Sequence, residues 1–113
     1  MGNDTTARNG PAAIQAGVGN GTNAFGYTGA LLELGEWGHW TMVFDGTQAD
    51  NASRLKFYFN GVQQSLSFVD TIPSSIGSMT DTVKIGWDGN TPSGCTTAAR
   101  YFNGLIDEVR VYN

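Results

Sequence analysis

The stretch that decides the fold is residues 55–64, LKFYFNGVQQ. Leu55, Phe57 and Phe59 alternate with Lys56 and Tyr58, and this period of two is typical of a β-strand with one buried face. An Asn-Gly pair follows directly. It favours a type I′ turn, because both central residues of that turn need positive φ. Residues 55–64 therefore predict a β-hairpin.

Similar alternating runs lie on both sides of the hairpin, separated by Gly, Asn or Pro. No stretch repeats apolar residues at the helical period, so the sequence predicts an all-β chain without helices. About eight short strands favour an antiparallel two-sheet sandwich or jelly roll over a barrel or an α/β fold. The predicted strands cover residues 12–18, 25–27, 30–34, 37–45, 55–59, 62–68, 83–87 and 105–112.

The run at residues 37–45 is the clearest of these strands. Both of its faces are largely apolar, with Trp40 on one face and Trp37 on the other. We therefore expect a strand at the centre of a sheet, with both tryptophans packed in the core. His39 is expected to pack or to form hydrogen bonds within the sandwich.

Length and charge restrict the class of protein. At 113 residues the chain predicts one domain, residues 1–113. The formal net charge is −4 and the six basic residues are scattered, which argues against binding nucleic acid or an anionic membrane surface. No apolar run approaches the roughly 18 residues of a membrane-spanning helix, and the first residues do not resemble a signal peptide.

Several short motifs follow one another from residue 37 to the C-terminus. They are Trp37-Gly38-His39, Asp45-Gly46, Leu55 with Tyr58 and Asn60-Gly61, Ile85-Gly86, and residues 102–113, FNGLIDEVRVYN. In this order and spacing the chain resembles the laminin-G-like, concanavalin A-like lectin/glucanase jelly-roll domains. It resembles a shortened version, because such domains have more strands ahead of the Trp-x-His strand.

The resemblance implies relatives that bind glycans, mediate adhesion or accompany carbohydrate-active enzymes. It also implies an extracellular or cell-surface location, and it makes calcium (Ca²⁺) a candidate structural ion. We therefore expect a non-catalytic carbohydrate-binding or adhesion-type module. The alternative is a structural, self-assembling sandwich that binds no sugar, and a less favoured third is a glycoside hydrolase relative.

The carboxylates argue against the hydrolase. Glycosidases that the chain resembles carry two Glu and an intervening Asp at alternate positions of one strand, so that all three share a face. The nearest match here is Glu33 and Glu36, whose spacing places the two carboxylates on opposite faces of a strand. His39 is the only histidine, so no histidine cluster can bind zinc.

Four residues around one loop are the candidate glycan-binding residues. Trp87 opens the loop that contains Asp88 and Asn90, and Tyr101 lies at its far end. Binding residues are often carried by such loops. An aromatic ring suits the apolar C–H face of a sugar, and a neighbouring acid or amide can bind the sugar hydroxyls.

Asp107 is the candidate metal ligand, for calcium. In a regular strand over residues 105–112 it shares a face with Val109, and a buried carboxylate must be paired or coordinated. The alternative is a β-bulge near Asp107-Glu108, in which the carboxylate accepts backbone N–H bonds, and we favour the bulge.

The shortened form also predicts self-association. A sandwich that lacks strands leaves an unpaired edge or an uncovered apolar face. A symmetric homodimer, formed by edge pairing or by strand exchange, would cover both with one surface used twice.

Overall fold

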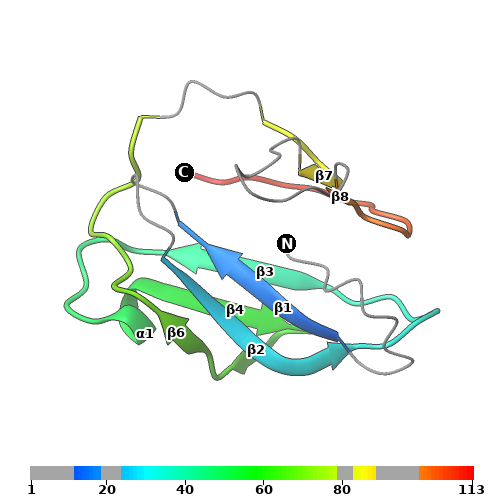
Figure 1. Cartoon of the computed structure of the whole chain (residues 1–113), viewed down its shortest axis with the longest axis horizontal. Coiled ribbons are helices and arrows are strands. Elements are labelled where there is room, and N and C mark those ends of the chain that lie inside the picture. The colour runs from blue at the N-terminus through cyan, green and yellow to red at the C-terminus, as the bar shows by residue number, and fades with distance from the viewer. Residues whose placement is uncertain (1–11, 19–23, 79–82, 89–99) are drawn as a thin grey trace. The chain divides into compact units, whose positions relative to one another are not determined.

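The computed structural model describes residues 12–18, 24–78, 83–88 and 100–113 of the chain. Two compact units make up the chain, residues 1–79 and residues 80–113. Their helices and strands are labelled in Figure 1. Among the residues described, no helix is long and apolar enough to cross a membrane.

The first unit contains two antiparallel sheets. One of them, termed here the β2 sheet, consists of β1 (Ala12–Gly17), β2 (Phe25–Leu32) and β6 (Ser67–Val69) in the order β1-β2-β6. The strands predicted at residues 12–18 and 25–27 are confirmed. The run at 30–34 forms no strand of its own, because its first residues continue β2.

The other sheet, termed the β4 sheet, consists of β3 (Trp40–Phe44), β4 (Leu55–Phe59) and β5 (Val62–Gln64) in that order. Between β4 and β5, φ is 49° at Asn60 and 80° at Gly61. Both residues lie in the left-handed region that a type I′ turn requires. The hairpin predicted from residues 55–64 is therefore confirmed.

The return strand of the hairpin is divided between the two sheets. The sequence predicts one strand over residues 62–68, but β5 ends at Gln64 and the chain continues into the other sheet as β6. Leu66, which lies between the two strands, packs against the core. One short segment thus completes both sheets.

The two sheets of the first unit share one apolar core. Leu55 and Phe57 of β4 are 1% and 2% exposed, and Ile14 of β1 is 2% exposed. Ile14 alternates with exposed residues along β1, and Leu55 and Phe57 alternate with half-buried ones along β4, as expected where each sheet buries one face. The predicted all-β antiparallel sandwich is confirmed. Its buried apolar residues are Ile14, Ala16, Val18, Ala24, Leu55, Phe57 and Ile72.

One short helix, α1 (Asn51–Arg54), interrupts the β-structure. The sequence predicts a polar loop here and no helix, and that prediction is wrong by a single turn. Asp50 caps the helix, because its Oδ1 accepts a hydrogen bond from the N–H of Ser53 at 2.9 Å. Four residues are too few to show a helical period in the sequence.

Side chains of α1 hold Ile72, the fully buried residue that follows β6. The N–H of Ile72 donates to Asn51 Oδ1 at 2.8 Å, and its carbonyl accepts from Arg54 Nη1 at 2.7 Å. Asn51 Nδ2 also donates to the carbonyl of Asp70 at 3.0 Å. Both main-chain polar groups of a buried residue outside the sheets are therefore satisfied.

The strand β3 differs from its prediction. It begins at Trp40 rather than at Trp37, and among the described strands it pairs with β4 alone. It therefore lies at the edge of the described sheet and not at its centre. Trp40 packs against the core as predicted. Trp37 is 66% exposed, so its predicted place in the core is wrong.

The second unit contains a two-stranded antiparallel ribbon formed by β7 (Trp87–Asp88) and β8 (Arg100–Tyr101). The strand predicted at 83–87 overlaps β7 only at its last residue. Residues 105–112 form no strand, so that prediction is wrong. Glu108 has a φ of 52°, which interrupts the extended backbone next to Asp107, where a bulge is predicted.

Candidate functional site

Three of the four predicted glycan-binding residues lie on the ribbon of the second unit. Trp87 on β7 is directly opposite Tyr101 on β8, and Asp88 is opposite Arg100. Residues directly opposite each other in antiparallel strands share a face, so the backbone brings the Trp87 and Tyr101 positions together. The sequence does not indicate that Arg100 lies beside Asp88, because this pairing depends on the register of β7 against β8. Asn90 lies outside the described residues.

Asp107, the predicted calcium ligand, is exposed. Its Oδ1 accepts the N–H of Glu108 at 2.8 Å. Glu108 in turn pairs with Arg110, with 2.6 Å between Oε2 and Nη2. In the part of the chain that the structure describes, no three His, Cys, Asp or Glu side chains gather where they could hold a metal ion.

Another group of residues lies on the outer face of the β2 sheet. Tyr27, on the central strand, is directly opposite Gln15 on β1 and Ser67 on β6. All three are exposed, because they alternate with residues that face the core. These three residues are termed the Tyr27 row. The row places an aromatic ring between an amide and a hydroxyl group.

A second aromatic residue extends the Tyr27 row along β2. The ring centroids of Phe25 and Tyr27 are 6.5 Å apart, and their planes are inclined at 50°. Tyr27 is 43% exposed, and Val69, which is opposite Phe25, is 39% exposed. The two rings and Val69 therefore form an apolar surface beside the polar ends of the row.

The sheet behind the Tyr27 row is closely packed. A Cβ atom placed on Gly26 would lie 3.0 Å from Leu66 Cδ1, so a side chain at this position would require its neighbours to shift. Near this point the register of β1 against β2 shifts. Thr28 Oγ1 accepts the N–H of Ile14 at 2.9 Å there, which satisfies a buried donor at the irregularity. Tyr27 therefore lies between two buried positions of β2, Gly26 and Thr28.

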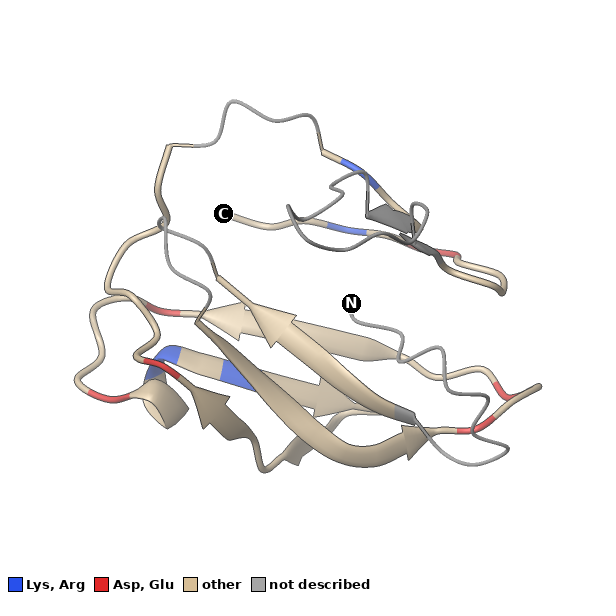
Figure 2. Ribbon diagram, in the orientation of Figure 1, with Lys and Arg blue, Asp and Glu red and all other residues tan. Residues whose placement is uncertain are grey.

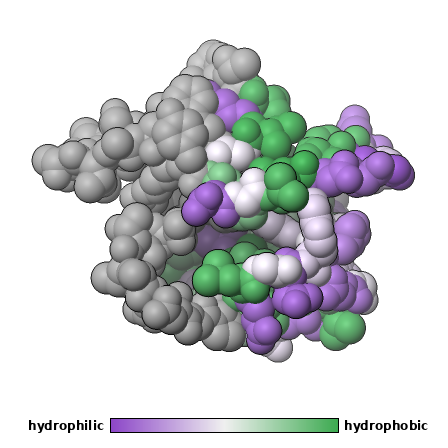
Figure 3. Space-filling view, turned by 90° about the vertical axis from the view of Figure 1, so that its right-hand side faces the viewer, coloured by the Kyte–Doolittle hydropathy of each residue, from purple (hydrophilic) through white to green (hydrophobic). Residues whose placement is uncertain are grey.

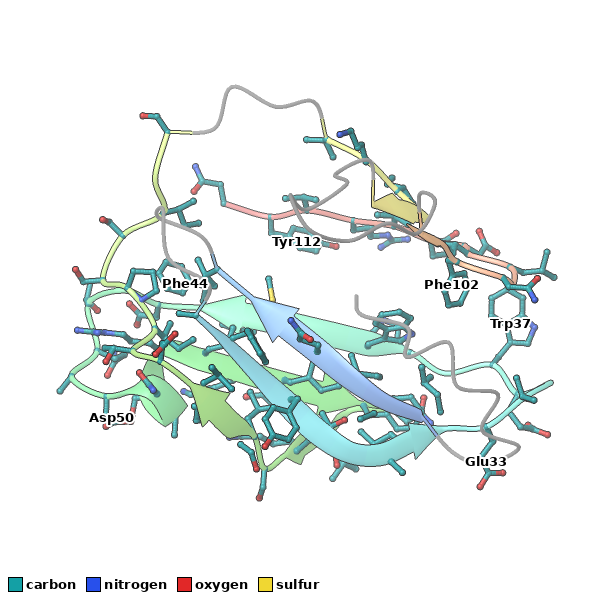
Figure 4. The ribbon with its side chains drawn as sticks, in the orientation of Figure 1. Glu33, Trp37, Phe44, Asp50, Phe102 and Tyr112 are labelled. Atoms are coloured by element: carbon teal, nitrogen blue, oxygen red, sulfur yellow. The ribbon has the colours of Figure 1, made fainter. Side chains whose placement is uncertain are left out.

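The strands that carry the Tyr27 row are uncharged. None of the three strands of the β2 sheet contains a charged residue (Figure 2). Glu33 and Glu36 are exposed in the loop between β2 and β3, and Figure 4 shows Glu33 in that loop. The same loop exposes Leu34 and Trp37, so apolar and charged groups are mixed there (Figure 3).

Two further carboxylates of the first unit, Asp45 and Asp50, accept hydrogen bonds from residues two or three positions further along the chain. Asp45 accepts hydrogen bonds from the Thr47 hydroxyl at 2.6 Å and from Gln48 Nε2 at 2.8 Å, and these bonds lower the pKa of Asp45. The N–H and hydroxyl of Ser53 likewise lower the pKa of Asp50. A general acid needs a raised pKa, so neither carboxyl is suited to protonate a leaving group near neutral pH.

The Tyr27 row is not visible in the sequence. Its members lie on three strands, and only the register of those strands brings them together. The local signal, Phe25 and Tyr27 two positions apart, predicts a strand but does not indicate which face is exposed. By contrast, Trp87 and Tyr101 can be identified as candidates from the sequence, because they lie at the two ends of one predicted loop.

The chain was compared with known proteins. A laminin G-like family model, described as the concanavalin A-like lectin/glucanases superfamily, matches residues 4–113. The matched range includes both the Tyr27 row and the ribbon of β7 and β8. No curated protein and no solved structure matches the chain.

Proposed function

The chain belongs to the concanavalin A-like lectin/glucanases superfamily, and from this premise we propose that it is a non-catalytic carbohydrate-binding module. The superfamily is consistent with a lectin-like or adhesion module. The observation that carries the proposal is the Tyr27 row, in which an exposed aromatic ring lies between an amide and a hydroxyl group.

Each group of the row matches a part of a pyranose ring. The apolar face of Tyr27 can stack on the C–H face of the sugar. Gln15 offers amide donors and an acceptor, and the Ser67 hydroxyl offers both. Directly opposite residues have Cβ atoms about 4.5–5.5 Å apart, so the two polar groups can reach hydroxyls at opposite edges of one sugar.

The uncharged surface favours a neutral glycan. A sulfated or uronic acid chain would need cationic side chains to offset the cost of desolvating its anionic groups. The strands of the β2 sheet provide none. Hydroxyl groups, in contrast, need only the neutral donors and acceptors that Gln15 and Ser67 supply.

The surroundings of the row also favour binding without hydrolysis. Retaining glycosidases need two carboxyl groups about 5–5.5 Å apart, on either side of the scissile bond. The described strands of the β2 sheet contain no carboxylate. The carboxyl groups of Asp45 and Asp50 are engaged by Thr47, Gln48 and Ser53.

The predicted contact around Trp87, Asp88, Asn90 and Tyr101 remains part of the proposal as an auxiliary contact for a polysaccharide chain, too weak to hold an oligosaccharide by itself. The opposed positions of Trp87 and Tyr101 on the ribbon support it. An extracellular or cell-surface location, where glycans are displayed, fits the family and is proposed with it.

The test is electrophoresis in native gels that contain a neutral polysaccharide, either a glucan, a galactan, a mannan or a xylan. At least one polymer should retard the wild-type protein. Tyr27→Ala should lose a measurable part of that retardation, whereas Tyr27→Phe keeps the ring and should retain all of it. Val62→Ala, which truncates an exposed apolar residue of β5, is the matched control and should bind like the wild type. Equal retardation of the wild type and Tyr27→Ala by every polymer would refute the role of the row.

A further inference from the structure

We propose that the domain has a second neutral-sugar site, on the outer face of the β4 sheet, and that it is therefore divalent. This inference rests on the proposed function. Tyr58 on the central strand of that sheet is directly opposite Thr41 on β3 and opposite Gln63 on β5. These three residues, the Tyr58 row, repeat the hydroxyl, tyrosine and amide of the Tyr27 row on a different sheet.

Strand alternation places the Tyr58 row on the outer face. Leu55 and Phe57 are buried in the core, so Tyr58 faces away from it. Thr41 and Gln63 share that face, because residues directly opposite in antiparallel strands do so. Both are exposed, and Tyr58 between them is partly exposed. A sugar stacked on Tyr58 would therefore meet a hydroxyl on one side and an amide on the other.

A hollow of about 400 Å³ adjoins one end of the Tyr58 row. It extends from Gln63 past the connection between β5 and β6. A pocket of this size is in the range of small-molecule sites, at the lower end of about 300–1,000 Å³. Its lining residues are Ala52, Leu55, Lys56, Gln63, Gln64, Ser65, Leu66 and Phe68.

The lining of the hollow supports a sugar as the occupant. Gln63, Gln64 and Ser65 supply neutral donors and acceptors, while Leu66 and Phe68 supply apolar surface. Lys56 is the only charged residue on the strands of the β4 sheet. The second site therefore also fits a neutral ligand, with Lys56 as a donor to a hydroxyl.

The two rows cannot contact the same sugar ring. Each lies on the face of its sheet that is turned away from the shared core, so the core separates them. A domain with two such sites would hold two glycan chains at once. It would thereby cross-link a surface without any need for self-association.

The experiment measures binding stoichiometry by isothermal titration with neutral hexasaccharides of glucose, galactose, mannose and xylose. We expect two equivalents per chain for the wild type with at least one hexasaccharide. Tyr58→Ala and Tyr27→Ala should each bind one equivalent, and the double variant none. Stoichiometry per chain is used because a dimer of single-site chains would also cross-link glycans. Tyr58→Phe keeps the stacking ring and should restore the second equivalent.

The outcomes separate the two proposals. One equivalent for the wild type, lost in Tyr27→Ala and kept in Tyr58→Ala, would overturn the second site and leave the proposed function standing. Binding that neither single variant changes would show that neither the Tyr27 row nor the Tyr58 row binds the sugar. The thermal unfolding transition of each variant is recorded alongside. A Tyr58→Ala protein that has lost its transition is replaced by Gln63→Ala, which should weaken the second equivalent at least about tenfold, the equivalent of 1.4 kcal/mol.

Discussion

His39 and Asn60 are joined by two hydrogen bonds, one through the main chain and one through a side chain. The N–H of Asn60 donates to the His39 carbonyl at 2.7 Å, and the N–H of His39 donates to Asn60 Oδ1 at 2.9 Å. The left-handed conformation of Asn60 starts the hairpin turn, and its side chain then supplies the acceptor for the His39 N–H. The turn residue thus extends the pairing of β3 and β4 by one step beyond Trp40.

Two substitutions at Asn60 separate these roles. Asn60→Gly keeps the left-handed conformation and loses the side-chain acceptor, so we expect a loss of about 1 kcal/mol in the free energy of unfolding. Asn60→Ala also loses the acceptor and is strained in the left-handed conformation, which should lower the free energy of unfolding by a further 1 kcal/mol or more, roughly. Urea denaturation monitored by tryptophan fluorescence measures both. Equal stability of Asn60→Gly and the wild type would show that the bond to His39 adds nothing.

Stability should fall at acid pH because of Asp45. Hydrogen bonds from Thr47 and Gln48 lower the pKa of Asp45 in the folded state below its ordinary value of 3.8. A carboxyl with a lowered folded pKa stabilises the protein above the unfolded pKa, and this contribution is lost as the pH falls through the folded value. Urea midpoints measured from pH 6 to pH 2 should therefore decline below about pH 4.

Two variants test this assignment. Asp45→Asn removes the titrating group, and Thr47→Val removes the hydroxyl that lowers its pKa most. Both should be less stable than the wild type near neutral pH and should decline less steeply in acid. An acid decline as steep in both variants as in the wild type would assign the effect to other carboxyl groups.

Trp87 and Trp40 should respond differently to truncation. Trp40 packs against the core, so Trp40→Ala should destabilise the domain by about 3–5 kcal/mol or prevent folding. Trp87 is predicted to stack on sugar, so Trp87→Ala should weaken binding to the polymer that retards the wild type and leave the thermal transition nearly unchanged. Calorimetry and gel retardation measure the two effects. Similar destabilisation by both substitutions would make Trp87 a core residue and remove it from the site.

Local chemistry explains which parts of the fold could be predicted. The Asn60-Gly61 turn needs positive φ at both positions, and few residue pairs meet that need, so the hairpin is readable from ten residues. The period-two alternation of apolar residues in β1 and β4 likewise marks them as strands that each bury one face. Strand identity and the sandwich class follow from these patterns.

The remaining features depend on tertiary pairing. The division of residues 62–68 between two sheets involves Leu66, whose apolar side chain fits a continuous strand as well as a crossover. Both tyrosine rows depend on register, which a period-two pattern does not specify between distant strands. Residues 105–112 have the composition of a strand but form none in the second unit, because a strand also requires a partner.

The contacts that hold Ile72 have a consequence for sequence variation. Asn51 and Arg54 bind only main-chain atoms of the segment at residues 70–72, and those atoms are the same whatever the side chains are. Substitutions at Thr71 should therefore be tolerated widely, as long as the position of Ile72 stays apolar. Asp70 has a φ of 60°, so its position should accept mainly Gly, Asn and Asp. Asn51 and Arg54, whose side chains donate these hydrogen bonds, should tolerate few substitutions. A library randomised at residues 51, 54, 70 and 71 should recover many residue types at 71, mainly Gly, Asn and Asp at 70, and few residue types at 51 and 54.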